Sequence, residues 1–495
     1  MLFRSTRSAA PSVGAERALL AGLAPDGGLY VPDHFPPLDP GLVGKSGLER
    51  EAALGYADIA YRTIAPFFDE LPAGELEAAI VRAAATFDDP RVAPVVVAGD
   101  LPVLELFRGP TLAFKDLALT LFGDLLAMAR KKAKLDEELL VIVATSGDTG
   151  SAALSGLENR KGVKIVVLYP RKGVSEVQRR QMTTRSASNC LVLGIEGNFD
   201  DAQRIAKRLL TDPESRRAFA EFGTSPCSAN SINIGRLAPQ LAYYVHAGRE
   251  LARLGLLDGE GRFDVAVPSG NFGNVLAARY AKEMGLPIEG FLVATNRNRV
   301  LADFLATGTC DRNRPFLVTT SPSMDILVSS NLERLLFMAT GRDPQRTAGL
   351  MADLAERGHY GLSEVERRAF ADFRGASADE AASAAEIRRF FETTGYLLDP
   401  HTATAAAALR SSGIHRPTLL IATASPFKFA GTVSAALGLK GRDDEFDAIE
   451  ALAERAGLAV PSQLASLRRA AEKHDRVVDP GKVEAVMLSW LAGKS

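Results

Sequence analysis

Short apolar runs alternate with helical stretches through the middle of the chain. The runs are rich in Val, Ile and Leu and lie at 138–144, 163–169, 190–193, 263–267, 290–294 and 418–422. Continuous apolar runs, as opposed to alternating apolar and polar positions, indicate strands of a parallel sheet that is buried on both faces. The alternation covers about 340 residues, more than one doubly wound sheet needs, so we predict an α/β protein with two α/β lobes and a cleft between them.

The two ends of the chain show a helical pattern instead. Leu48–Phe68 and Leu71–Phe87 carry apolar residues at helical spacing, and charged helical patterns return over 341–394 and after Gly441. The alanine-rich run 405–409 is typical of a closely packed helix face. We therefore divide the chain into a mainly helical N-terminal domain (1–95), a smaller α/β lobe (96–235), a larger α/β lobe (236–440) and a C-terminal helical tail (441–495).

Composition and charge narrow the possible ligands. The chain is 46% apolar and 24% charged, which is ordinary for a globular protein. Its 58 basic and 60 acidic residues leave a net charge of −2, which gives no broad attraction for nucleic acid or anionic lipid. We expect a small-molecule substrate and neither a nucleic-acid nor a membrane partner. No apolar run reaches the roughly 18 residues of a membrane span.

Cysteine and histidine usage indicates a reducing compartment and no metal site. Cys190, Cys227 and Cys310 lie too far apart for a disulfide framework or a zinc knuckle, and the six histidines show no metal-ligand spacing. Residues 1–22 carry arginines and serines typical of a transit peptide, but Glu16 interrupts them and no apolar block follows. We expect a cytoplasmic protein that keeps this segment.

Four junctions between strands, loops and helices hold the candidate chemistry, because ligands of parallel sheets bind beyond the carboxyl ends of strands. The first is Ser269–Asn274 (SGNFGN), which lies between a strand and a helix. Its two glycines allow close approach of the backbone, and free N–H groups at a helix start favour an anion such as phosphate. The alternative is a glycine turn that only joins the two elements.

Two further junctions offer hydroxyl groups. Thr145–Gly150 (TSGDTG) follows an apolar strand and could seat a carboxylate, unless Ser146, Asp148 or Thr149 simply caps the next helix. Ile421–Pro426 (IATASP) presents the hydroxyls of two residues at a strand end, where capping is again the alternative.

The fourth junction, Gly109–Leu119, places a single lysine, Lys115, in an apolar stretch. Burial would lower the pKa of its amine and make it a Schiff-base candidate. The alternative is a lysine on a solvated helix edge beside Asp116. A buried lysine, a phosphate-type glycine loop and strand-end hydroxyls together are what pyridoxal 5'-phosphate needs. A serine hydrolase is not indicated, because no Gly-x-Ser-x-Gly occurs.

The motifs GPTLAFKD (109–116), TSGDTG (145–150) and PSGNFGN (268–274) together resemble threonine synthase, a pyridoxal-phosphate enzyme of the tryptophan-synthase β-subunit type, fold type II. The segments 21–32, 230–236, 323–326 and 399–402 are similar to its longer bacterial and fungal form. The resemblance covers residues 21–429. It implies conversion of O-phospho-L-homoserine and water to L-threonine and phosphate, the last step of threonine biosynthesis.

The resemblance also implies roles for individual residues. Lys115 would form the covalent link to pyridoxal 5'-phosphate, and Thr423 would meet the nitrogen of the cofactor ring. Ser146 and Thr149 match the positions for the substrate carboxylate. The cofactor phosphate would be held by Gly270, Asn271, Phe272, Gly273 and Asn274, and the substrate phosphate by Asn230, Ser231 and Arg236.

Asp148 departs from the shorter relatives, which have an asparagine next to the phenolic oxygen of the cofactor. An ionised aspartate would repel that oxygen, so the protonation of Asp148 is the open question of the predicted site.

Two other functions stay open at this point. A relative with the same cofactor could eliminate phosphate from a phosphorylated amino acid and release a 2-oxo acid. A catalytically silent module could bind a phosphorylated metabolite, without visible cofactor absorbance and without a borohydride-trapped adduct on Lys115. The sequence does not distinguish a monomer from a homodimer.

Overall fold

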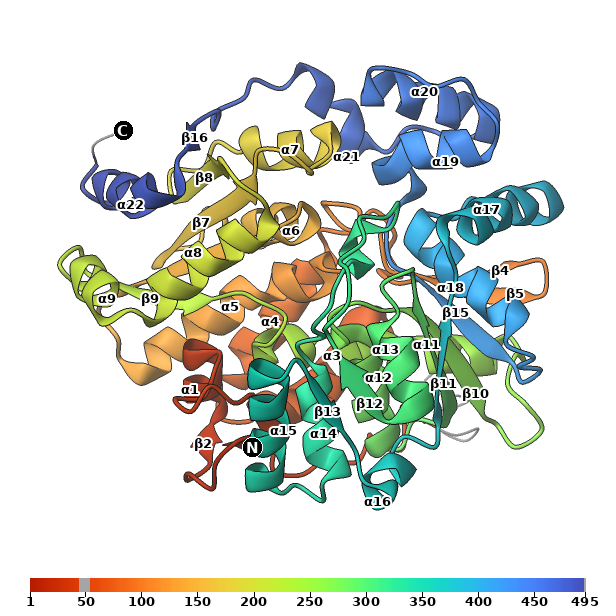
Figure 1. Cartoon of the computed structure of the whole chain (residues 1–495), viewed down its shortest axis with the longest axis horizontal. Coiled ribbons are helices and arrows are strands. Elements are labelled where there is room, and N and C mark those ends of the chain that lie inside the picture. The colour runs from red at the N-terminus through yellow and green to blue at the C-terminus, as the bar shows by residue number, and fades with distance from the viewer. Residues whose placement is uncertain (44–53, 494–495) are drawn as a thin grey trace.

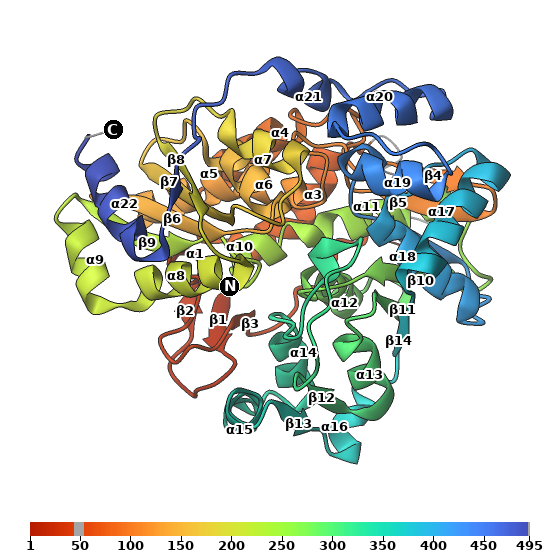
Figure 2. The ribbon, with the colours of Figure 1, turned by 45° about the horizontal axis from the view of Figure 1, so that its top comes forward.

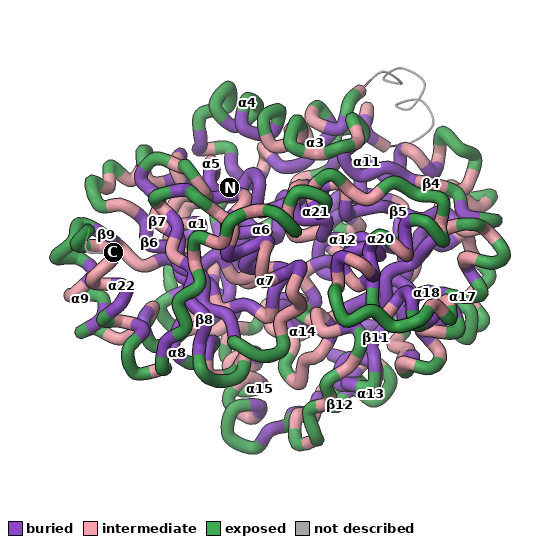
Figure 3. The backbone as a smooth tube through the Cα atoms, turned by 90° about the horizontal axis from the view of Figure 1, so that it is seen from above, coloured by how far each residue is buried: buried purple, intermediate pink, exposed green. Residues whose placement is uncertain are grey.

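The computed structural model describes residues 1–43 and 54–493 and confirms the predicted α/β fold with two lobes. Each lobe is built on a mostly parallel sheet with helices on both faces, and the two sheets lie side by side (Figure 1). All six strands predicted from apolar runs are present. The most deeply buried segments are these strands and the helices packed between them (Figure 3).

The smaller lobe has a five-stranded parallel sheet. Its strands, in spatial order, are β16 (Val477–Val478), β8 (Cys190–Ile195), β7 (Val163–Pro170), β6 (Glu138–Ala144) and β9 (Thr224–Ser228). One face is covered by α5 (Asp116–Ala133), α6 (Asp148–Leu157) and α7 (Glu176–Thr183), and the other by α8 (Phe199–Thr211), α9 (Pro213–Ala220) and α22 (Val483–Leu491).

The apolar run of β6 shows why this sheet is buried on both faces. Leu139, Val141 and Val143 pack into the cluster that includes α5 and α6, whereas Leu140 and Ile142 pack into the cluster that includes α8 and α22. Successive side chains of a strand point to opposite faces, so a strand between two helical layers needs an apolar residue at every position.

The larger lobe has a six-stranded sheet. Its order is β14 (Phe373–Ser377), β11 (Ile288–Thr295), β10 (Phe263–Pro268), β15 (Thr418–Ala422), β5 (Leu101–Glu105) and β4 (Val95–Ala98), and only β4 runs antiparallel to its neighbour. The faces are covered by α11 (Gln240–Arg253), α12 (Gly273–Glu283) and α13 (Val300–Thr307), and by α17 (Glu380–Thr394), α18 (Pro400–Ser411), α19 (Ala430–Ala436) and α20 (Glu445–Ala456). The alanine-rich run lies in α18, and Ala405–Ala408 are buried.

The structure differs from the expected division of the chain in two places. Residues 96–105 were expected in the smaller lobe, but β4 and β5 extend the larger sheet, because Val103 and Leu104 of β5 pair with β15. The C-terminal tail was expected to be helical only, but β16 pairs with β8 and adds a strand to the smaller sheet. β5 and β16 each pair with a strand about 300 residues away, which local pattern cannot reveal.

The N-terminal domain combines helices with a small antiparallel sheet. The sheet consists of β2 (Val13–Gly14), β1 (Leu2–Ser5) and β3 (Tyr30–Pro32), beside α14 (Leu332–Ala339) of the larger lobe (Figure 2). Arg7 donates two hydrogen bonds to Glu333 of α14, at 2.8 and 2.6 Å. The remaining elements are α1 (Ala15–Ala21), α3 (Tyr56–Ile64), η1 (Ala65–Phe68) and α4 (Ala73–Ala84). The predicted helix over 71–87 is thus α4, and the start of the one predicted over 48–68 lies outside the described residues.

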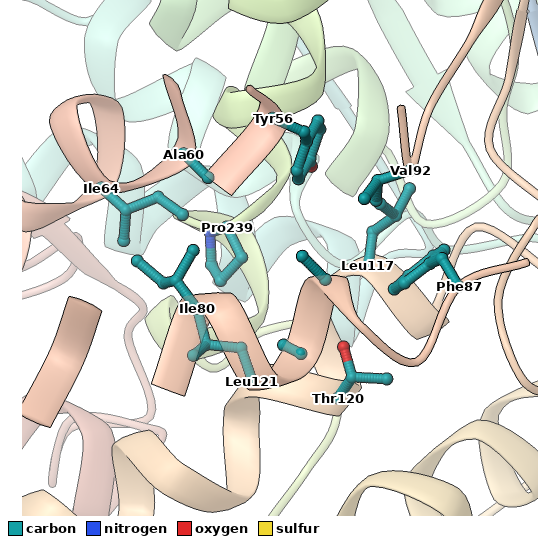
Figure 4. A pocket seen from close by; sticks show the side chains of 12 residues that line it. Tyr56, Ala60, Ile64, Ile80, Phe87, Val92, Leu117, Thr120, Leu121 and Pro239 are labelled. Carbon is teal, nitrogen blue, oxygen red and sulfur yellow. The ribbon is translucent and has the colours of Figure 1, made fainter. Parts of the chain in front are cut away.

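The helices of this domain pack against α5, the helix that follows Lys115. A small cavity of about 20 Å³ remains between α3, α4 and α5, and its almost entirely apolar lining includes Tyr56, Ile80 and Leu121 (Figure 4). The space has room for about one water molecule and is far too small for a cofactor. The domain therefore supports α5 through packing.

Within the described part of the chain, no helix is long and apolar enough to cross a membrane. The same residues contain no cluster of three or more His, Cys, Asp or Glu side chains that could hold a metal ion.

Candidate active site

Lys115 stands at the first position before α5, at a point where the two lobes meet. The loop that carries it is joined to the larger lobe because the Phe114 N–H donates to the Thr423 carbonyl oxygen at 2.8 Å. Asp116 points away from Lys115: it is buried and accepts hydrogen bonds from the Thr111 N–H and hydroxyl at 2.8 and 2.6 Å. A solvated helix edge beside an aspartate is therefore excluded for this lysine.

The Lys115 side chain is 13% exposed, and its Nζ lies 3.4 Å from Asp148 Oδ2. Burial lowers the pKa of the Lys115 amine, because an ammonium is poorly solvated there. Asp148 opposes this shift, whereas the positive charges of Lys428 and Arg236 add to it. The net result is an amine that loses its proton more readily than an exposed lysine.

The carboxylate of Asp148 has four partners. Lys428 Nζ lies 2.8 Å from Oδ1, and Gln178 Nε2 donates to the same oxygen at 2.8 Å. The Ser323 hydroxyl donates to Oδ2 at 3.1 Å, beside Lys115. Burial alone would raise the pKa of Asp148, but Lys428, Lys115 and the Gln178 hydrogen bond hold this pKa well below its usual range. These neighbours favour the charged form of Asp148, and Lys428 supplies a positive charge beside it.

Lys428 is the residue that the sequence analysis missed. It lies only five positions beyond Thr423, in the segment that follows β15, and its side chain is fully buried. Its closeness to a predicted strand end was the only signal in the sequence.

The TSGDTG loop leaves two hydroxyls free. Thr145 Oγ1 accepts hydrogen bonds from the N–H groups of Gly147 and Gly150, both at 2.9 Å, and so satisfies the start of α6. Among the hydrogen bonds of residues 1–43 and 54–493, none involves the hydroxyls of Ser146 or Thr149, which are both half-buried. The capping role is thus taken by Thr145, and the two predicted carboxylate ligands remain available.

The glycine loop before α12 has the shape of an anion site. Phe272 is buried and adopts a left-handed backbone conformation with φ of 63°, directly before the helix. A side chain at Gly270 would place its Cβ 2.6 Å from the Ser323 carbonyl oxygen, so only glycine fits. The first N–H groups of α12, opened by Gly273, have no partner within the helix, and its dipole favours negative charge.

Asn274 supplies a directed donor at the same place. Its Oδ1 accepts from the hydroxyls of Tyr243 and Tyr244, at 2.8 and 2.6 Å. This arrangement fixes the orientation of the amide, and its Nδ2, which is buried, has no hydrogen-bond partner within the described structure. A buried N–H donor without a partner, beside a helix start, fits the phosphate group of pyridoxal 5'-phosphate.

Arg236 is a second unsatisfied buried donor. One terminal nitrogen donates to the Ala229 carbonyl oxygen at 2.7 Å, whereas Nε is buried without a partner in the residues described. Burial lowers the pKa of this guanidinium to about 10. An anionic ligand that accepts from the fork would offset the cost of burying the charge.

Asn230 and Ser231 lie on the loop before Arg236 and are half-buried. The hydroxyl of Ser231 is 3.4 Å from that of Ser330, which donates to Asn271 Oδ1 at 3.2 Å. The predicted substrate-phosphate loop is thus connected to the predicted cofactor-phosphate loop.

The junction Ile421–Pro426 divides between its two hydroxyls. Ser425 caps the turn that follows, since its Oγ accepts from the Phe427 N–H. Thr423 is buried, its N–H donates to Thr402 Oγ1 at 3.3 Å, and its own hydroxyl bonds to no described residue. Capping therefore explains Ser425, while Thr423 stays available.

A segment from Ser321 to Asn331, here called the strap, connects these parts. The Ser323 N–H donates to His401 Nε2 at 3.3 Å, and His401 Nδ1 lies 2.8 Å from Asp399 Oδ1. Asp325 accepts four hydrogen bonds from the loops around it. The motifs at 323–326 and 399–402 were noted in the sequence without a role, and here they hold a hydroxyl group beside Asp148.

Two known families match this chain. Residues 2–84 match the family described as threonine synthase N terminus, and residues 102–423 match the family described as pyridoxal-phosphate dependent enzyme.

Individual relatives extend the similarity to nearly the whole chain. The chain is 39% identical to the threonine synthase of Pseudomonas aeruginosa over 450 residues, which cover 88% of this chain and 90% of that protein. It is 38% identical over 439 residues to the human protein threonine synthase-like 1, covering 86% of this chain and 58% of the human one. The structure is similar to that of PLP-bound threonine synthase from Brucella melitensis, with a TM-score of 0.88, 36% identity and coverage of 100% and 99% of the two chains.

Proposed function

The chain belongs to the threonine synthase family of pyridoxal-phosphate-dependent enzymes, and from this premise we propose O-phospho-L-homoserine as its substrate and Lys115 as the residue that anchors the cofactor. The observation that carries the proposal is a buried lysine amine next to an ionised, charge-balanced aspartate. Lys428 is also buried beside this aspartate, but Lys115 is the lysine that lies in the GPTLAFKD motif at the start of α5.

The residues around Lys115 fit the parts of the cofactor. When bound, pyridoxal 5'-phosphate withdraws electrons and makes protons on Cα and Cβ of an amino acid acidic. The free Nδ2 of Asn274 and the loop Gly270–Gly273 would hold its phosphate. The Thr423 hydroxyl would face its ring nitrogen, and because a hydroxyl is not an anion, it would not keep that nitrogen protonated.

The proton transfers fall to Lys115. A neutral amine of lowered pKa can take a proton from Cα, and its ammonium form can return one near neutral pH. Asp148 lies close enough to stabilise the ammonium form during the transfer, at 3.4 Å from Nζ.

The substrate would be held at both ends. The free hydroxyls of Ser146 and Thr149 are suited to a carboxylate. Arg236, with Asn230 and Ser231, is suited to the γ-phosphate, because the planar guanidinium fork matches phosphate oxygens. Loss of a proton from Cβ would expel the phosphate from Cγ, and water would then add its hydroxyl at Cβ while Cγ gains a proton and becomes the methyl group of threonine. We place the enzyme in the cytoplasm, which the three free, buried cysteines support.

The test is a product analysis of the cofactor-loaded protein with O-phospho-L-homoserine. Threonine and phosphate in equal amounts support the proposal. Release of 2-oxobutyrate, ammonia and phosphate would identify an eliminating enzyme instead. If the protein takes up no cofactor, as shown by a lack of visible absorbance after incubation with pyridoxal 5'-phosphate, and forms no product, it is a binding module.

A further inference from the structure

A second buried lysine shares the carboxylate that faces Lys115. Lys428 lies in the short turn η3 (Pro426–Phe429) after β15, and its side chain has no exposed surface. Its Nζ is 2.8 Å from Asp148 Oδ1, and Lys115 Nζ is 3.4 Å from Asp148 Oδ2. One carboxylate thus stands between two ammonium positions, and Lys428 is the nearer of the two.

Such a pair is costly to bury, so its place next to the anchoring lysine calls for a chemical reason. Removing one partner of a buried ion pair leaves an uncompensated charge, whereas replacing both with neutral groups is often tolerated. A structural role could be filled by apolar side chains. The arrangement therefore makes sense where the carboxylate itself is needed and its charge has to be offset.

The carboxylate alone would work against the amine of Lys115. An opposite charge within about 4 Å favours the ammonium form, and the ammonium form can neither attack an aldehyde nor remove a proton. A second positive charge on the same carboxylate weakens this effect.

We propose that Lys428 is a positioning residue that balances the charge of Asp148, so that Asp148 can face Lys115 without fixing a proton on it. The inference rests on the proposed role of Lys115. It assigns to Lys428 no contact with the substrate.

The charges around Lys115 come from several elements. Asp148 at the start of α6 is the negative neighbour, and the positive ones are Lys428 after β15 and Arg236 in α10 (Ile234–Leu237). Asp116 in α5 faces Lys428 and Thr111, and burial raises the pKa of its carboxyl. With Lys428 removed, the effect of Asp148 on Lys115 would be opposed by burial and by the positive charge of Arg236, but no longer by a charge on the carboxylate itself.

The test measures the titration of Lys115 in the full-length protein after removal of its cofactor. Pyridoxal 5'-phosphate is added between pH 6 and pH 10, and borohydride traps the product at timed intervals. Mass spectrometry of the Lys115 peptide then gives the rate of attachment at each pH. The midpoint of this profile reports the free amine and does not require turnover.

Charge balance predicts opposite shifts for the two single variants. In Lys428→Met the midpoint should move up by about 1 pH unit or more, because Asp148 then stabilises the Lys115 ammonium. In Asp148→Asn it should move down by a similar amount. In the double variant it should return to within about half a unit of the wild type, since neither charge remains.

An unchanged midpoint in a folded Lys428→Met protein would overturn the inference. If that variant does not fold, Asp148→Asn and the double variant decide: equal midpoints in these two mean that Lys428 has no influence on Lys115. The matched control is Lys282→Met, which breaks another Lys–Asp pair, with Asp372 at 2.9 Å, near the start of β11 and at the opposite end of the sheet from the site. Absence of an adduct on Lys115 of the wild type, under conditions that label exposed lysines, would refute the proposed function instead.

Discussion

Charged side chains with almost no access to water dominate the site at the scale of single residues. Lys115, Asp148, Arg236 and Lys428 are all buried or nearly so, and each is stabilised only by its neighbours. In such surroundings the geometry of a charge matters as much as its sign. Substitutions that keep the charge and change the shape are therefore informative.

The first prediction concerns Lys115→Ala. Turnover should fall by at least about three orders of magnitude, because the group that moves the Cα proton is lost. The protein should still fold, since Lys428 continues to neutralise Asp148. Threonine formation and near-ultraviolet circular dichroism measure the two effects. Turnover close to the wild-type rate would show that another residue does this chemistry.

The second prediction concerns Arg236→Lys. The lysine keeps the positive charge but loses the planar fork, so capture of the substrate phosphate should weaken by about 1 to 3 kcal/mol. We expect KM for O-phospho-L-homoserine to rise about tenfold or more. The exposed Arg253→Lys variant is the control and should keep the wild-type KM. A KM within twofold of the wild type in Arg236→Lys would place the phosphate elsewhere.

Sequence reasoning predicted the residues that sit in recognisable local patterns. Lys115 and the glycine loop were found because each follows an apolar run with unusual spacing. Lys428 was missed because lysine side chains are rarely buried, and nothing in the sequence around this one predicts burial. Only the packing of η3 against α6 removes it from water, and that contact joins residues 280 positions apart.

At the scale of elements, the strap joins the two lobes over the site. It contacts Asp148 of the smaller lobe through Ser323, and it contacts the glycine loop through Ser329, whose hydroxyl donates to the Gly270 carbonyl oxygen at 2.7 Å. His401 of α18 holds it from the larger lobe. Apart from one turn of 3-10 helix, η2 (Pro322–Met324), the path of this segment is fixed by individual hydrogen bonds.

The third prediction is that His401→Phe loosens the strap. The Ser323 N–H and Asp399 would each lose a buried partner, at a cost of about 1 to 3 kcal/mol per group. We expect kcat/KM to fall about tenfold to a hundredfold and amide hydrogen exchange over 321–331 to become faster. The exposed His359→Gln variant should change neither quantity. Unchanged exchange in His401→Phe would show that the other hydrogen bonds of the strap hold the segment without His401.

A second contact between elements is sensitive to pH. His246 of α11 packs edge-on against Tyr56 of α3, with 5.4 Å between ring centroids, and burial lowers the pKa of His246 to about 4 from an ordinary value of 6.5. Between pH 6.5 and pH 4, His246 is protonated in the unfolded chain but stays neutral in the folded protein. This contribution to stability is thus complete above about pH 6.5 and is lost as the pH falls towards 4.

The fourth prediction follows from this linkage. Between pH 7.5 and pH 4.5, the free energy of unfolding of the wild type should decrease by about 2 to 3 kcal/mol more than that of His246→Leu. Urea unfolding at the two pH values measures the difference. Between pH 7.5 and pH 9 the two proteins should show the same slope. Parallel curves over the acidic range would mean that His246 stays accessible to protons.

At the scale of the whole molecule, the C-terminal tail connects the lobes on the outside (Figure 1). Its first helix, α20, packs on the larger lobe, whereas β16 and α22 complete the smaller one. The α/β class and the core strands could be predicted, because they depend on local apolar runs. The path of the tail from the larger lobe to the smaller one could not be predicted. The strand β16 has only two residues, and it pairs with a strand almost 300 positions earlier.

The last prediction tests whether the tail reaches the active site through α7. Glu445 accepts from the N–H groups of Glu176 and Val177, both at 3.1 Å, and so caps the helix that carries Gln178. Glu472 forms ion pairs with Arg179 and Arg180 of the same helix. In the double variant Glu445→Ala/Glu472→Ala, α7 loses its anionic cap and two ion pairs, about 1 to 2 kcal/mol in all.

Amide hydrogen exchange over α7 should become about tenfold faster in this variant, because a loss of this size raises the population of the open helix by that factor. The hydrophobic contacts of α20 and α22 remain, so exchange in these helices should stay as it is. Glu450→Ala on the exposed face of α20 is the control, since it removes a carboxylate of the same helix without touching α7. If α7 exchanges at the wild-type rate in the double variant, Glu445 and Glu472 do not stabilise this helix, and its link to the tail depends on other contacts, such as the hydrogen bonds from Arg180 to the Leu467 and Ala470 carbonyl oxygens.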